Sequence, residues 1–71
     1  MNPTSSTSVT SYGKTIFASE VGTMSIYNLQ GTQVLQADRV TSIDTHLASG
    51  FYIVQFTNDV GHKIVQKIAI R

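Results

Sequence analysis

The sequence predicts an all-β fold, an Ig-like β-sandwich of about seven short antiparallel strands. Nine Thr, seven Val and seven Ile stand among the 71 residues, and such β-branched side chains fit a pleated strand better than a helix. No window long enough for a helix has helical periodicity. Turn residues instead recur about every ten residues, a spacing that is typical of a sandwich.

Each expected strand has apolar residues at strand spacing and ends at a turn signal. Val9 is the strong apolar anchor of the first strand, and Met24 and Ile26 alternate with polar residues in the third. Breaks between strands are expected where Gly22 and the Asp-Arg pair at 38–39 interrupt the pattern. The expected strands are residues 8–12, 14–18, 23–28, 33–37, 41–44, 51–57 and 62–70.

The last two strands have the strongest pattern. Residues 51–57 are apolar on both faces, which is typical of a central strand. The final strand has one apolar face and one mixed face that is expected to meet water. Because it also carries basic residues, we expect an exposed edge that pairs with a partner's strand. The apolar face holds Ile64, Ile68 and Ile70 with Gln66, and the mixed face holds Val65, Lys67, Ala69 and Arg71.

The chain divides into a polar start and one domain. Residues 1–8 are rich in hydroxyls and are interpreted as a linker or as the start of the first strand, and residues 9–71 form a single domain. Five cations against four carboxylates give a net charge of +1, so neither nucleic acid nor an anionic membrane is an expected partner. The apolar runs are too short to span a bilayer, and no Cys is present for a disulfide or a thiolate metal site.

No catalytic or metal-binding constellation is evident, so we expect no enzyme activity, no cofactor and no metal. The motifs of serine hydrolases and zinc peptidases are absent, and His46 and His62 are interpreted as loop residues. Asp44 with His46, or Asp59 with His62, supplies two ligands where a metal needs three or four. The six aromatic residues are interpreted as core rather than as a binding platform.

Three segments together resemble the type A C-terminal sorting domain of cargo proteins that the type IX (Por) secretion system of Bacteroidetes exports. SIYNLQGTQV at 25–34 is similar to the family's aromatic-Asn-x-x-Gly-x-x-Val hairpin, and IDTHLASGFYIV at 43–54 to its Ile-Asp-x-x-x-Leu-x-x-Gly-hydrophobe-Tyr pattern. KIAIR at 67–71 resembles the basic-flanked apolar strand that closes these chains, and Asn-Pro at 2–3 resembles their usual start. The family's clear first strand is weaker here, since residues 4–11 hold only Val9 as an apolar residue.

The resemblance implies that the chain is an export address and not a catalyst. It would follow a larger cargo domain, be recognised by the type IX translocon in the periplasm, and cross the outer membrane to be secreted or held at the cell surface. A sortase-like component would then remove it. The residues that the resemblance assigns to recognition are Gly31, Gly50, Tyr52, Lys67, Ile68, Ile70 and Arg71.

Two other readings of the residues remain open. The first is a non-catalytic β-sandwich module that binds carbohydrate or protein through aromatic side chains and is appended to a secreted enzyme. The second is a spacer that forms a homodimer in isolation, because pairing would hide an exposed edge strand. Gly31 and Gly50 would then serve only as turn residues, and Tyr52 and Ile68 only as core.

Overall fold

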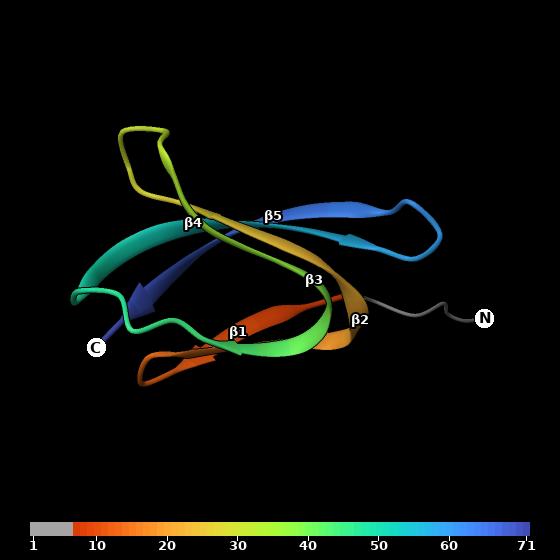
Figure 1. The fold of residues 1–71 in the computed structure, drawn as a ribbon, viewed down its shortest axis with the longest axis horizontal. Coiled ribbons are helices and arrows are strands. Elements are labelled where there is room, and N and C mark those ends of the chain that lie inside the picture. The colour runs from red at the N-terminus through yellow and green to blue at the C-terminus, as the bar shows by residue number, and fades with distance from the viewer. Residues whose placement is uncertain (1–6) are drawn as a thin grey trace.

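The computed structural model describes residues 7–71, so most of the expected linker at 1–8 lies outside the described residues. Five antiparallel strands form one sheet (Figure 1). The described residues hold no helix that is long and apolar enough to cross a membrane. The strands are β1 (Val9–Tyr12), β2 (Thr15–Tyr27), β3 (Gln33–Asp44), β4 (Gly50–Asn58) and β5 (Lys63–Ile70).

The sheet is built around β2, which is long enough to serve two sets of neighbours. Its first residues pair with β1 on one side and with the end of β3 on the other. Its last residues pair with β4 and with the start of β3, and β5 then pairs with β4. As a result, β1 and β4 lie along the same side of β2 at different heights.

A bend divides β2 into these two parts. The pairing with β3 shifts register between Phe17 and Gly22 and again between Gly22 and Met24. A Cβ built on Gly22 would lie 2.3 Å from the carbonyl oxygen of Thr57 and 2.6 Å from Cζ of Phe56. Glycine is therefore required here because β4 passes too close for any side chain, and not because the chain reverses.

The expected count of seven strands is wrong for the described residues, which form five. The segments at 14–18 and 23–28 are one strand, β2, and the segments at 33–37 and 41–44 are one strand, β3. Arg39 lies in β3 with a positive φ of 55°, so the Asp-Arg break is an irregularity within a strand. The all-β class is confirmed, but an Ig-like sandwich is not.

The bend folds the single sheet into two facing layers (Figure 1). The turn after β1 meets the end of β5, where the Arg71 amide donates to the Gly13 carbonyl oxygen at 3.1 Å. The Ser11 hydroxyl donates to the Ala69 carbonyl oxygen at 2.9 Å. These contacts join the two ends of the sheet, so β1 and β5 nearly close it on itself.

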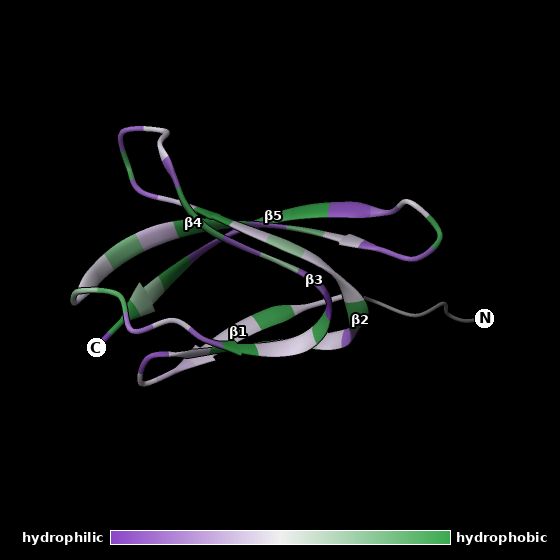
Figure 2. Ribbon diagram, viewed as in Figure 1, coloured by the Kyte–Doolittle hydropathy of each residue, from purple (hydrophilic) through white to green (hydrophobic). Residues whose placement is uncertain are grey.

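The core lies between the layers and draws on four strands. Hydrophobic and hydrophilic bands alternate along these strands (Figure 2), as a sheet with one dry face requires. In β5, Ile68 and Ile70 are 6% and 2% exposed while Val65 is 61% exposed, which confirms the expected division of its faces. The buried hydrophobic residues are Val9, Ile16, Met24, Ile26, Val54, Phe56, Ile68 and Ile70.

Candidate recognition surface at the end of the terminal strand

The connection between β3 and β4 is fixed by polar contacts at its start. Thr45 is 3% exposed, and its hydroxyl donates to the Lys14 carbonyl oxygen at 2.8 Å. The Lys14 ammonium donates to the Leu47 carbonyl oxygen at 2.7 Å, and the Leu47 side chain packs against the core. These bonds hold the connection against the turn between β1 and β2. The connection itself carries the chain from one layer to the other.

Tyr52 and Gly50 shape the other end of this connection. The Tyr52 hydroxyl donates to the Ala48 carbonyl oxygen at 2.8 Å, while its ring packs against the core. Gly50 has a φ of 151°, within the region that favours glycine, and it pairs with Ile70 across to β5. Both residues therefore set the path by which β4 begins beside the end of β5.

Gly31 belongs to an Asn-capped loop that occurs twice in the fold. In the loop after β2, the Asn28 side-chain oxygen accepts from the Gln30 and Thr32 amides at 2.9 and 3.0 Å. The loop after β4 repeats the arrangement, since the Asn58 side-chain oxygen accepts the two corresponding amides at 3.1 and 2.9 Å. Gly31 is exposed with a φ of 91°, and it is suited to this turn whether or not a partner contacts it.

The basic residues of the terminal strand are exposed and its isoleucines are not. Ile68 and Ile70 belong to the buried core. Lys67 and Arg71 are exposed, and within the described residues neither makes an ion pair. A partner can therefore reach the two cations directly, whereas the isoleucines act through the position of the strand.

An exposed aromatic ring lies beside the Lys67 side chain. The Lys67 ammonium lies 4.8 Å from the centroid of the Phe51 ring, a cation–π distance, and Phe51 is 56% exposed. Phe51 pairs with Ala69 across β4 and β5. Sequence reasoning missed Phe51 because its strand is apolar on both faces, so no alternation showed which face meets water.

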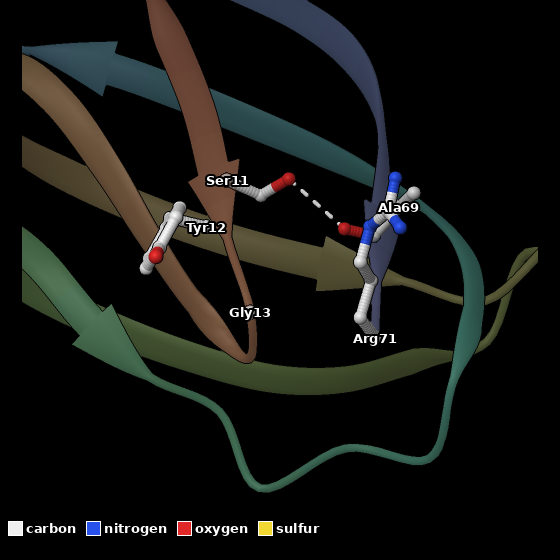
Figure 3. Close-up of a pocket in the computed structure, with 5 residues that line it drawn as sticks. All are labelled: Ser11, Tyr12, Gly13, Ala69 and Arg71. Atoms are coloured by element: carbon white, nitrogen blue, oxygen red, sulfur yellow. Dashed lines mark hydrogen bonds between the residues drawn. The ribbon is translucent and has the colours of Figure 1, made fainter.

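A shallow hollow lies between the ends of β1 and β5. Figure 3 shows the Ser11 hydroxyl turned toward the Ala69 carbonyl, while Tyr12 projects from the other side of β1. The Arg71 side chain lies beside the end of β5 in the same view. The hollow therefore has one basic residue, Arg71, at its rim, and its lining residues are Ser11, Tyr12, Gly13, Ala69 and Arg71.

Most of the residues that the sequence singled out meet at this end of the sheet. Gly50 pairs with Ile70 and Tyr52 with Ile68, and Lys67 lies opposite Ile53 in the same ladder. Arg71 follows directly after β5. Gly31 is the exception, since it lies on the loop beyond β2, away from this pairing.

The remaining polar groups of residues 7–71 do not gather into a second site. The Asp44 carboxylate lies 3.7 Å from the His46 imidazole, and the two side chains are 66% and 82% exposed. Among the described residues no three His, Asp or Glu side chains gather as metal ligands would. Hydrogen bonds from Thr7 and from Asn58 lower the pKa of the Glu20 carboxyl below its usual 4.5.

The aromatic residues divide between core and surface. Phe56 is fully buried, and Tyr52 packs against the core. The expectation that all six are core is wrong for Tyr12, Phe51 and Phe17, which are 82%, 56% and 42% exposed. Tyr12 pairs with Thr15 on β2 and Phe51 with Ala69 on β5, so the two exposed rings belong to different ladders.

These features define a small all-β domain whose accessible features, among the described residues, are loops, the edges of β1, β3 and β5, and a basic terminal segment. The chain belongs to the family of secretion system C-terminal sorting domains, which it matches over residues 2–71. Neither a curated protein nor a solved structure matches it. The expected recognition as a type IX sorting domain is confirmed.

Membership of the family establishes the function in outline. The chain is a C-terminal sorting signal for type IX secretion, in a family that is in general not catalytic. It acts with the type IX machinery and is attached to a cargo protein. Its destination is the cell surface or the extracellular space.

Proposed function

We propose that the folded domain carries a larger cargo protein from the periplasm across the outer membrane, and that the type IX translocon recognises it at the end of β5. The observation that carries this proposal is the meeting of the second and third family motifs in one ladder, where Gly50 pairs with Ile70 and Tyr52 with Ile68. Lys67 and Arg71 are the exposed charges at this place.

The proposed recognition residues have two different roles. Lys67 and Arg71 contact the translocon, because their cationic groups are exposed. Gly50, Tyr52, Ile68 and Ile70 place the strand, because they fix the start of β4 or fill the core. Gly31 shapes its loop, and we assign it no contact.

Removal of the domain by a sortase-like component is proposed to occur before Thr7. The Thr7 hydroxyl donates to the Glu20 carboxylate, and the Ser8 amide donates to the Ser19 hydroxyl oxygen at 2.9 Å. The Ser19 amide donates in return to the Ser8 carbonyl oxygen at 3.0 Å. A backbone held in this way resists a peptidase, which needs an extended and accessible substrate.

The recognition role is tested with substitutions rather than with a deletion. Removing residues 67–71 would also remove Ile68 and Ile70 from the core, so lost export would not distinguish recognition from unfolding. The pair Lys67→Gln and Arg71→Gln removes two exposed charges and leaves the core intact. The control, Arg39→Gln, removes an exposed cation on β3, away from the end of β5.

The chain is fused to a periplasmic reporter, and surface and periplasmic reporter are measured in a type IX-competent strain. We expect the first pair to lower the surface fraction at least tenfold while the thermal unfolding midpoint falls by no more than about 8 °C, which is the loss of one exposed cation–π contact. The Arg39→Gln control should export normally. Normal export by the Lys67 and Arg71 pair would contradict recognition at this end of the strand.

A carbohydrate-binding module is the second candidate, because Tyr12 and Phe51 expose their rings. Tyr12 pairs with Thr15 on β2 and Phe51 with Ala69 on β5, and two rings in different ladders do not provide the row of rings that a glycan platform needs. NMR shifts of the two aromatic side chains on addition of polysaccharides would reveal such binding. We expect no change across a panel of neutral and acidic glycans.

A further inference from the structure

The outer edge of β5 presents unpaired backbone groups between residues 63 and 67. The Ala69 carbonyl and the Arg71 amide point away from β4, since they bond to Ser11 and Gly13. Neighbouring residues of an antiparallel strand direct their backbone groups to opposite sides, and β5 pairs with β4 without a register shift. The amides of Lys63, Val65 and Lys67 therefore also point away from β4.

No described strand pairs with this part of the edge. β5 pairs with β4 alone, and the hydrogen bonds that join this end of the chain to the β1 hairpin are made by residues 69 and 71. The Lys67 carbonyl oxygen has one local contact, which is the Gln66 side-chain amide at 3.3 Å. The edge at 63–67 thus presents a regular row of unpaired backbone amides and carbonyls, which can accept another strand.

Charge indicates which strand would fit. Lys63, Val65 and Lys67 are exposed on the same face of β5, and the two cations lie about 13 Å apart along the strand. The facing residues of β4 carry no carboxylate, so the cations have no anionic neighbour in the ladder. The facing residues are Phe51, Ile53, Gln55 and Thr57.

We propose that this edge binds an extended acidic segment of the secretion machinery as an added antiparallel strand. The segment would place carboxylates opposite Lys63 and Lys67 and an apolar residue opposite Val65, in the pattern acidic-x-apolar-x-acidic. The inference rests on the proposed function, because that function is the reason for taking the segment from the secretion machinery. It extends the recognition surface to Lys63, which no family motif includes.

Two other features of the molecule favour this occupant and this edge. A second copy paired about Val65 would place Lys63 opposite the Lys67 of its partner twice, and like charges repel in such positions. The other long edge, on β3, is interrupted by register shifts and by Arg39 with its positive φ. A regular added strand therefore fits β5 better than β3.

The binding test uses amide hydrogen exchange on the chain and the peptide acetyl-Thr-Glu-Thr-Val-Thr-Glu-Thr-amide. In the free chain we expect fast exchange at Lys63, Val65 and Lys67 and slow exchange at Ile64 and Gln66. The peptide should slow the three odd-numbered amides at least tenfold. A control peptide with Lys in place of Glu should bind at least about tenfold more weakly.

Two sets of variants separate backbone pairing from charge. Val65→Pro removes an outward amide, which an edge strand tolerates, and it should abolish binding, whereas Val65→Ala should retain it. Lys63→Glu with Lys67→Glu should reverse the preference between the two peptides. Unfolding midpoints show that each variant is folded.

Unchanged exchange at saturating peptide, or equal binding of both peptides, would overturn the inference. Without peptide, protection of the three amides from exchange that rises with chain concentration would assign the edge to a second copy of the chain. This result would also overturn the inference. In the reporter assay, normal export by a folded Val65→Pro variant would refute strand addition at this edge while leaving the proposed function intact. A wild-type fusion that stays in the periplasm would refute the proposed function itself.

Discussion

Substituting Gly22 with Ala tests whether the bend in β2 holds the two layers together. The new Cβ would meet the Thr57 carbonyl oxygen at 2.3 Å, Cζ of Phe56 at 2.6 Å and Cα of Asn58 at 3.0 Å. Two of these three atoms belong to the backbone of β4, so a side-chain rotation cannot relieve the contacts. The two strands must move apart beside the fully buried Phe56.

The expected cost is large for a domain of this size. Overpacking a filled site costs about 1–3 kcal/mol, and contacts with backbone place Gly22→Ala at about 3 kcal/mol. A chain of 71 residues has a total stability of about 4–10 kcal/mol. The thermal midpoint should therefore fall by about 12–24 °C.

Thermal unfolding followed by circular dichroism measures this loss, and Gly31→Ala provides the matched control. Gly31 has a φ of 91° but no atom within 4 Å of an added Cβ, so its substitution costs only backbone strain of about 1 kcal/mol. We expect a midpoint loss two- to threefold larger for Gly22→Ala than for Gly31→Ala. Equal losses would refute the argument that close packing of β4 requires glycine in the bend.

Three further predictions concern the core, a loop and the pH dependence of stability. Ile68→Ala should cost about 2–5 kcal/mol in urea unfolding, because Ile68 is 6% exposed; a smaller loss would show that the end of β5 is not packed. Asn58→Ala should cost about 2–3 kcal/mol and Asn28→Ala about 1 kcal/mol. Each change leaves two amides without an acceptor, but Asn58 is buried and its two hydrogen bonds are partly buried, whereas those of Asn28 are exposed to water; equal costs would contradict this ranking. Since the pKa of Glu20 is lowered in the fold, its carboxylate stabilises the fold above pH 4.5, and this contribution is lost as pH falls through the lowered pKa. In Glu20→Gln the thermal unfolding midpoint should therefore fall less below pH 4.5 than in the wild-type chain. An equal fall in both would contradict a stabilising role of the Glu20 carboxylate.

The all-β class and the faces of β5 could be predicted from the sequence, whereas the strand count could not. Ile68 and Ile70 are buried and Val65 is exposed, as alternation indicated. Gly22 and Arg39 break the local pattern as turn residues do, but the chain continues through both positions. The difference lies in pairing with distant strands, such as Gly22 with Asn58, which local composition does not encode.

The candidate site could be predicted only in part, because alternation along a strand shows exposure but not which distant strands lie together. The exposure of Lys67 and Arg71 follows from the alternation of β5. The exposed Phe51 ring beside Lys67 did not follow, because both faces of β4 are apolar. The bond from Ser11 to Ala69 joins residues 58 positions apart, and it depends on the bend that folds the sheet.

Delivery of a passenger by the whole chain tests the central claim most directly. Residues 1–71 are fused to a periplasmic reporter, and the surface fraction of the reporter is compared between a type IX-competent strain and one that lacks the translocon. The account predicts surface reporter in the competent strain and periplasmic reporter in the other. Periplasmic reporter in both strains, with the domain folded, would contradict the claim that this chain is an export address.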